Sequence, residues 1–97
     1  MIPIHELLSR IRWDENYARS RFVIGYWDRI EHKVLHADLR EISWDRDNPT
    51  FFDLMDEDGV AHSIPYHRVR EVWRDGKLIW ARHAAGEPPA QPPADSQ

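Results

Sequence analysis

The dipeptide Asp75-Gly76 separates two short runs of apolar and basic residues near the end of the chain. Asp-Gly between two strand-like runs is a strong signal for a two-residue hairpin loop, because both residues tolerate the positive φ that this turn needs. We therefore predict an antiparallel hairpin over residues 67–82, with Trp73 opposite Leu78. A chain with such a hairpin needs further strands or a helix to cover its apolar face.

Alternation along the hairpin predicts two different faces, with Val72 opposite Ile79. The core face would carry Val69, Trp73, Leu78 and Trp80, interrupted by Glu71. The other face would carry Val72 and Ile79 beside the basic residues Arg68, Arg70, Arg74 and Lys77. A helix over residues 66–74 is the alternative, since its apolar residues also fit helical spacing. Only the strand version gathers the positive charge on one exposed face.

The first residues predict an amphipathic helix over residues 3–12. Pro3 stands in the first turn, where its missing N–H costs nothing, and apolar residues follow at helical spacing at Ile4, Leu7, Leu8 and Ile11. Arg10 and Arg12 fall in the last turn, where positive charge interacts favourably with the helix dipole.

Between the helix and the hairpin, short apolar runs alternate with turn sequences. Residues 21–27 are β-branched or aromatic and apolar on both faces, which is typical of a central strand. Gly25 inside this strand predicts a bulge or the close approach of another group. Further strands are expected over residues 33–39, 51–55 and 60–65. The predicted class is α+β, with an N-terminal amphipathic helix and a small, mostly antiparallel, barrel-like β-sheet.

The length of 97 residues allows one hydrophobic core. Residues 84–97 are proline-rich and contain no apolar residue larger than alanine, so they cannot bury enough surface to fold. We expect a single domain over residues 1–83 and a disordered tail over residues 84–97. The absence of cysteine excludes disulfides and Cys-ligated zinc, and no apolar run approaches the ~20 residues that span a bilayer. A cytoplasmic protein without membrane contact is expected.

The charge is distributed unevenly along the chain. The net charge of −4 argues against a protein that coats nucleic acid through a diffuse positive field. Residues 38–58 hold two basic and eight acidic groups, whereas residues 59–83 hold five basic and two acidic groups. A positive face beside an acidic loop would hold a short, local anion and repel bulk duplex. The alternative is that both segments are ordinary solvated surface.

The sequence gives no support for a metal site, a cofactor or catalysis. His32 and His36 are four residues apart, but the residues around them predict a turn and a strand, and no third ligand is near. The paired H-x-[ST] elements of cyclic-phosphate phosphodiesterases are absent, because Ser63 directly follows His62. We therefore predict no catalytic residue, no metal ligand and no cofactor.

Two groups of residues have chemistry that suits an RNA terminus: residues 12–14, and residues 25–29 together with residues 64–70. Guanidinium groups bind phosphate oxygens in pairs, and aromatic rings stack on unpaired bases. The alternative is structural: the aromatic rings would belong to the core, and Asp14 and Asp28 would pair with Arg12 and Arg29 to cap turns.

Several strings of the chain resemble the small domain called the RNA repair, or RNA cyclic group end recognition, domain, formerly the domain of unknown function numbered five hundred and four. They are Pro3-Ile4, Leu8-Ser9-Arg10-Ile11-Arg12-Trp13-Asp14, Ile24-Gly25-Tyr26 with Asp28-Arg29, Asp56-Glu57-Asp58-Gly59, Ile64-Pro65 with His67-Arg68-Val69-Arg70, and Asp75-Gly76 with Trp80. The resemblance runs from Met1 to about Arg82, and Ser9 stands where many members have asparagine. It implies a largely β domain with an N-terminal helix that recognises RNA ends carrying a 2′,3′-cyclic phosphate.

The resemblance also implies a set of RNA-binding residues: Arg12, Asp14, Tyr26, Asp28, Arg29, His67, Arg68 and Arg70. We expect a non-catalytic module that binds RNA, single-stranded or at a 3′ end, in RNA repair or processing. In this hypothesis the arginines grip the terminal phosphate, His67 donates a hydrogen bond, and Tyr26 supports the last base.

Two alternatives stay open. One is a phosphodiesterase-type enzyme that processes RNA ends with His67 as its acid–base group. The other is an adaptor that docks on an RNA ligase, kinase or phosphoesterase, which the high aromatic content and the proline-rich tail would suit.

Overall fold

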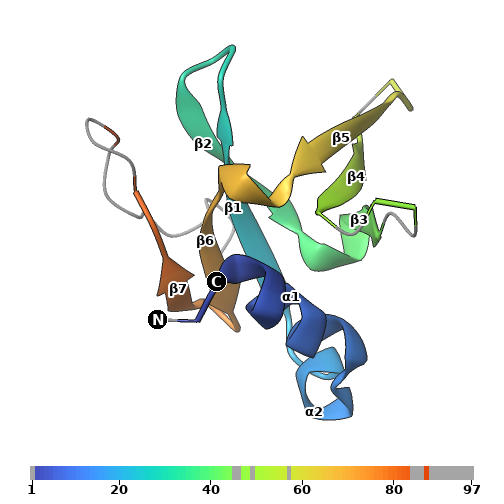
Figure 1. Cartoon of the computed structure of the whole chain (residues 1–97), viewed down its shortest axis with the longest axis vertical. Coiled ribbons are helices and arrows are strands. Elements are labelled where there is room, and N and C mark those ends of the chain that lie inside the picture. The colour runs from blue at the N-terminus through green and yellow to red at the C-terminus, as the bar shows by residue number, and fades with distance from the viewer. Residues whose placement is uncertain (1, 45–46, 49, 57, 84–86, 88–97) are drawn as a thin grey trace.

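The computed structural model describes residues 2–44, 47–48, 50–56, 58–83 and 87 (Figure 1). Two helices precede seven strands, and the strands form two antiparallel sheets. The predicted α+β class is confirmed. The barrel-like arrangement is not formed in this part of the chain, because the strands divide into two sheets that do not close on each other. No helix in the described ranges is long and apolar enough to cross a membrane.

Helix α1 spans Ile4–Trp13 and begins after the extended residue Pro3, one residue later than predicted. Its buried residues are the four apolar positions that the helical spacing indicated: Ile4, Leu7, Leu8 and Ile11. The helix ends at Asp14, whose side chain accepts a hydrogen bond from the Asn16 amide at 2.8 Å. This bond caps a second helix, α2 (Glu15–Ala18), which the sequence did not predict.

The larger sheet has the order β2-β1-β6-β7. Its strands are β1 (Phe22–Asp28), β2 (Lys33–Asp38), β6 (Val69–Arg74) and β7 (Lys77–Ala81). Strand β1 is central, as its apolar residues on both faces indicated, and it pairs with β2 and β6. Asp75 and Gly76 both have positive φ, at 50° and 83°, so the predicted hairpin turn between β6 and β7 is confirmed.

The smaller sheet has the order β3-β4-β5. Strand β4 (Phe51–Met55) has the predicted bounds, β5 (Ala61–Pro65) begins one residue late, and β3 (Ile42–Trp44) was not predicted. Two short 3-10 helices connect the sheets: η1 (Leu39–Glu41) follows β2, and η2 (Tyr66–Arg68) precedes β6.

The hydrophobic core lies where α1 packs across the two sheets, in front of β1 and β6 in Figure 1. Its most buried residues are Leu8, Ile24, Phe52, Val69 and Val72. The last strand joins the start of the chain, because Trp80 Nε1 donates a hydrogen bond to the Ile2 carbonyl at 2.9 Å. The apolar residues of the helix and of six strands thus share one core.

Two bulges make the predicted faces of the β6–β7 hairpin wrong. Trp73 pairs with Leu78 as expected, but Val72 pairs with Trp80 because Ile79 is an extra residue in β7. A second register shift makes Arg70 an extra residue in β6, opposite β1. As a result Val69 and Val72 both enter the core, although they are three residues apart.

The basic residues of the hairpin consequently do not form one common face, although Arg74 and Lys77 pair directly across β6 and β7. Arg68 lies in η2, and Arg70 is the extra residue at the bulge of β6. The Arg74 guanidinium lies 4.8 Å from the Tyr17 ring, and Lys77 is the first residue of β7. The prediction of one basic face is therefore wrong, because the alternation of side chains on which it depended breaks at both bulges.

Gly25 confirms the prediction of a bulge and a close approach. The register between β1 and β6 shifts between Gly25 and Tyr26. A Cβ atom at position 25 would lie 2.8 Å from Glu71 Oε1. Glu71 is buried and accepts hydrogen bonds from Trp73 Nε1 at 2.8 Å and from His36 Nε2 at 3.0 Å, with His36 acting as donor. Glycine leaves the space that this buried carboxylate occupies.

The predicted tail, residues 84–97, lies outside the described residues except for Glu87. Glu87 contacts the folded domain: its carboxylate accepts hydrogen bonds from Arg70 Nε at 2.7 Å and from Arg70 Nη2 at 3.2 Å. Both side chains are nearly buried.

Candidate functional site

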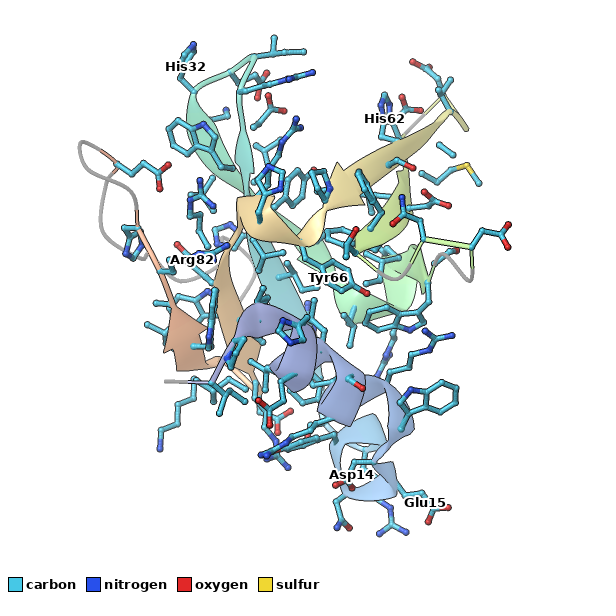
Figure 2. All side chains as sticks on the ribbon, in the orientation of Figure 1. Asp14, Glu15, His32, His62, Tyr66 and Arg82 are labelled. Atoms are coloured by element: carbon cyan, nitrogen blue, oxygen red, sulfur yellow. The ribbon has the colours of Figure 1, made fainter. Side chains whose placement is uncertain are left out.

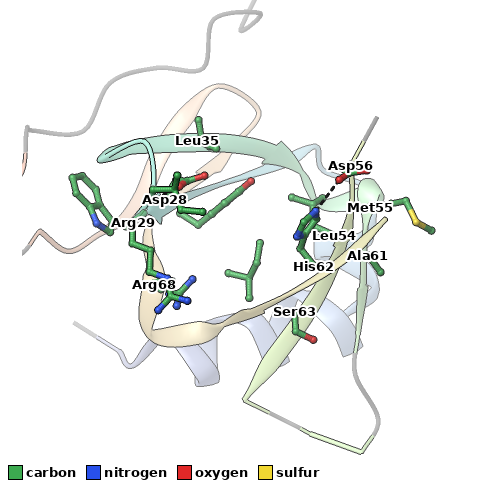
Figure 3. A pocket seen from close by; sticks show the side chains of 14 residues that line it. Asp28, Arg29, Leu35, Leu54, Met55, Asp56, Ala61, His62, Ser63 and Arg68 are labelled. Carbon is green, nitrogen blue, oxygen red and sulfur yellow. Dashed lines mark hydrogen bonds and ion pairs between the residues drawn. The ribbon is translucent and has the colours of Figure 1, made fainter. Parts of the chain in front are cut away.

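A hollow of about 600 Å³ lies between the β1–β2 hairpin and the β4–β5 hairpin, and η2 borders it (Figure 3). We call it the end hollow. Residues 26–30 and Leu35 supply one side, and residues 54–56 and 61–64 supply the other, with Arg68 between them. Segments that are distant in the sequence are thus brought together because each sheet contributes one hairpin.

The β1–β2 turn holds Asp28 and Arg29 at the border of the end hollow. Asp28 Oδ1 accepts hydrogen bonds from the Ile30 amide at 2.8 Å and the Glu31 amide at 3.1 Å, which fixes the turn. These amide bonds lower the pKa of Asp28 below its ordinary value, and the positive charge of Arg68 adds to the effect. The carboxylate therefore stays charged at neutral pH and lies within the electrostatic reach of Arg68.

Arg29 and Arg68 are the cations of the end hollow. Arg29 is exposed on the turn, and Arg68 is half-buried in η2. In Figure 3 both side chains extend toward the space between the hairpins. Within the described ranges neither guanidinium forms a hydrogen bond or an ion pair. Their donors are consequently available for an anion.

The opposite end of the end hollow carries His62 on β5. Its Nε2 lies 2.8 Å from Asp56 Oδ2, and in Figure 3 the imidazole points into the hollow. Asp56 also accepts hydrogen bonds from the amides of Asp58 and Val60, each at 2.9 Å. The His62 contact, followed by the Val60 amide, lowers the pKa of Asp56. Ser63 points away from the hollow and donates its hydroxyl to Asp53 at 2.7 Å.

The floor between these polar ends is apolar and aromatic. Tyr26 pairs with Leu35 across β1 and β2, and Ile64 and Leu54 face them from the smaller sheet. Tyr26 packs against the core. Burial raises the pKa of its phenol, and the charges of Asp28 and Glu31 raise it further, so the hydroxyl stays protonated and can donate a hydrogen bond.

Four of the eight predicted RNA-binding residues line the end hollow: Tyr26, Asp28, Arg29 and Arg68. The other four lie outside it: Arg12, Asp14, His67 and Arg70. Figure 2 shows Asp14 at the α1–α2 end of the molecule, away from His62 on β5. Asp14 caps α2, and the Arg12 guanidinium lies 4.6 Å from the Trp13 ring.

His67 lies in η2, and Arg70 lies at the bulged start of β6. Arg70 Nη1 donates a hydrogen bond to the His67 carbonyl at 2.6 Å, and Arg82 Nη2 donates to the same oxygen at 2.9 Å. The Arg70 guanidinium also pairs with Glu87. These bonds hold the backbone of the bulge, so Arg70 is committed to contacts within the chain.

The predicted structural role of the aspartates is correct in part. Asp14 and Asp28 do cap turns, but they do so by accepting backbone amides. Trp13 is 73% exposed, so its ring is not part of the core.

Sequence reasoning missed His62 and Asp56 as members of the site. The alternation of β5 could have indicated His62, because it stands two residues before Ile64 and so points to the same face. Asp56 and His62 meet because they flank the β4–β5 turn. No group of three or more His, Cys, Asp or Glu side chains in the described part of the chain is arranged to hold a metal ion.

Comparison with known proteins identifies the family to which the chain belongs. Residues 1–82 match the MJ1316 RNA cyclic group end recognition domain. No curated protein and no solved structure matches the chain. The match covers all of α1 through β7 and therefore includes both sheets and the end hollow between them. The chain belongs to the MJ1316 RNA cyclic group end recognition domain family.

Proposed function

We propose that the end hollow binds the terminal nucleotide of a single-stranded RNA 3′ end, with the phosphate held by Arg29 and Arg68. The observation that carries the proposal is the pair of guanidinium groups, which reach one hollow from two different elements and form no hydrogen bond or ion pair among the described residues. The volume of about 600 Å³ lies within the range of small-ligand sites.

Each wall of the end hollow would have its own role. Guanidinium groups bind phosphate oxygens through two parallel hydrogen bonds, which suits Arg29 and Arg68. An aromatic ring and an apolar floor accept an unstacked base or the sugar, which suits Tyr26 and Ile64. His62 would contact the nucleotide from the end opposite the arginines.

The charges of the end hollow favour a cyclic phosphate over a linear one. A 2′,3′-cyclic phosphate carries one negative charge, whereas a terminal monophosphate carries about −1.5 to −2 at pH 7. Asp28 is close enough to Arg68 for that cation to lower the pKa of its carboxyl. A second negative charge on the ligand would meet this carboxylate, so Asp28 would select against linear ends. The mechanism is binding alone, and no covalent step is required.

The test is a titration of labelled short RNAs that differ only in the 3′ end: cyclic phosphate, linear phosphate or hydroxyl. We expect the cyclic end to bind most tightly. Arg68→Ala and Arg29→Ala should each weaken this binding by about 10- to 100-fold, the usual effect of losing a hydrogen bond to a charged group. Arg10→Ala is the matched control, because it removes an equal charge from an arginine already paired with Glu6.

Salt dependence gives an independent result. With two or three phosphates contacted, the logarithm of the affinity for single strands should fall with the logarithm of salt at a slope of about −1.5 to −2. Arg68→Ala should make the slope shallower by about 0.7. Equal affinity for all three ends contradicts recognition of the end.

One observation favours a hydrolytic alternative: His62 contacts Asp56 at 2.8 Å within the same hollow. In this reaction His62 would take a proton from water, the water oxygen would bond to phosphorus, and one ring P–O bond would break with its ribose oxygen receiving the proton. In this alternative His62 takes the role that the sequence suggested for His67, because His62 lines the hollow and His67 does not. Ring opening that is lost in His62→Ala would establish the hydrolytic activity. If no ring opening is detected at high protein concentration, the hydrolytic alternative is excluded.

A further inference from the structure

The end of α1 carries the exposed indole of Trp13 beside the half-buried Arg12, which also contacts the partly buried Trp44 of β3, and the end hollow uses none of the three. The Arg12 guanidinium carbon lies 4.6 Å from the ring centre of Trp13 and 5.4 Å from that of Trp44. Trp13 is 73% exposed. We call these three residues the Arg12 cluster.

Burial does not explain Trp13. An indole is the side chain with most apolar area to gain from a core, yet this ring is left in solvent at the last residue of α1. The guanidinium contact with it contributes only about 0.5–1 kcal/mol at an exposed site. The ring therefore adds little to folding, and most of its surface is available to a ligand.

The cations beside Arg12 and Trp44 favour an anionic ligand, although Trp13 itself lies beside Asp14 and Glu15 as well as Arg10. A second hollow of about 180 Å³ adjoins the Arg12 cluster, lined by Arg12, Arg40 and Trp44 among others, and it shares no residue with the end hollow. The carboxylate in its wall, Asp38, is already paired with Arg21 at 3.1 Å. Among the described residues the guanidinium groups of Arg12 and Arg40 have no hydrogen bond or ion pair.

An exposed aromatic ring beside unpaired cations is the combination by which proteins hold single-stranded nucleic acid. Bases stack on the ring, and the cations contact the phosphates. The smaller sheet connects the Arg12 cluster with one wall of the end hollow: Trp44 pairs with Phe52, and Phe52 pairs with Ile64 of the end hollow. Two strand spacings, about 10 Å, separate the backbones of Trp44 and Ile64.

We propose that the Arg12 cluster is a second RNA subsite, which stacks an unpaired base several nucleotides upstream of the 3′ end. The upstream base lies on the Trp13 indole, and Arg40 contacts the adjoining phosphate. This inference rests on the proposed function, because the same strand occupies the end hollow. It gives Arg12 a role in RNA binding at a place distinct from the terminal phosphate.

The test compares two ligands that share the cyclic end: a 2′,3′-cyclic mononucleotide and a single-stranded hexanucleotide with a 2′,3′-cyclic 3′ end. Trp13→Ala should weaken binding of the hexanucleotide by about 5- to 150-fold, because one base stack is lost. It should leave the affinity for the mononucleotide unchanged. Trp13→Phe should retain most of the affinity because it keeps an aromatic face. Arg12→Ala should weaken only the hexanucleotide, whereas the control Arg10→Ala should change neither ligand.

The outcomes separate this subsite from the end hollow. If Trp13→Ala leaves the hexanucleotide affinity unchanged, the subsite is wrong and the exposed indole serves another partner, such as a protein. Equal weakening of both ligands also overturns it, because the effect is then on the whole domain. If wild type binds the hexanucleotide but not the mononucleotide, and Trp13→Ala abolishes that binding, the subsite stands and the end hollow fails.

Discussion

Replacing Gly25 by alanine should destabilise the domain strongly, although the change adds a single methyl group. The new Cβ would lie 2.8 Å from Glu71 Oε1, 3.0 Å from Val34 Cγ1 and 3.1 Å from Glu71 Cβ. The Glu71 carboxylate cannot simply turn away, because Trp73 Nε1 and His36 Nε2 both donate to the same oxygen. The methyl group therefore strains the sheet and weakens a hydrogen bond to the buried Glu71 carboxyl group.

The magnitude follows from these contacts. Overpacking costs about 1–3 kcal/mol, and a buried acceptor that loses its donor costs about 1–3 kcal/mol. Replacing a strand glycine returns about 0.5–1 kcal/mol of backbone entropy. Together these terms give a net loss in the free energy of unfolding of about 1–5 kcal/mol, which lowers the midpoint of thermal unfolding by roughly 4 °C or more in a domain of this size.

Urea denaturation followed by circular dichroism measures this loss, with two comparisons. Gly59→Ala is the matched control: its φ is +81° but no atom lies within 4 Å of the new Cβ, so only about 1–2 kcal/mol of backbone strain is expected. In a Glu71→Ala background the nearest contact is absent, and Gly25→Ala should then cost at least 0.5 kcal/mol less, a coupling typical of neighbours. A Gly25→Ala protein within about 0.5 kcal/mol of wild type would refute the explanation of this glycine.

Three further predictions concern charged groups. Asp28→Asn keeps an oxygen that can accept hydrogen bonds from the turn amides but removes the charge. The affinity for the linear 3′-phosphate should therefore rise by up to about fivefold, with the affinity for the cyclic end little changed. An unaltered ratio of the two affinities counts against selection by Asp28. The pKa of both Asp28 and Asp56 is lowered from 3.8 in the folded protein, so the stability they contribute is complete above that pH and is lost as the pH falls through the lowered values. Urea denaturation between pH 2.5 and 6 should show this decline, and Asp56→Asn should reduce it; an unchanged profile contradicts the assignment. Glu87→Gln should cost about 1–3 kcal/mol in urea denaturation, because it weakens the nearly buried pair with Arg70, and a loss below about 0.3 kcal/mol is incompatible with that pair.

The parts of the fold that the sequence predicts are those set by local pattern. The spacing of apolar residues in α1, the central position of β1 and the Asp75-Gly76 turn each follow from a few neighbouring residues. The faces of the β6–β7 hairpin do not, because each bulge shifts every later side chain to the other face. Nothing in the local sequence marks Arg70 or Ile79 as an extra residue, since bulges arise where two strands must fit a shared core.

The candidate site could be predicted in its chemistry but only partly in its geometry. Residues 26–29 and Arg68 were expected to act together, and they line one hollow because the two hairpins face each other. Arg12 was expected beside them but lies at the end of α1, a separation that depends on how the helix crosses the sheets. Arg70 was expected to bind RNA, yet the structure gives its guanidinium to Glu87, a partner 17 residues away that no local pattern indicates.

The most direct measurement of the central claim is an NMR titration of isotope-labelled protein with a 2′,3′-cyclic mononucleotide. We expect saturable shifts of the guanidinium Nε–H signals of Arg29 and Arg68 and of the amides of residues 26–30 and 61–64, with Arg10 and Arg12 unaffected. Saturable binding whose shifts lie at the end of α1 or along β7, with the Arg29 and Arg68 signals unmoved, would contradict it.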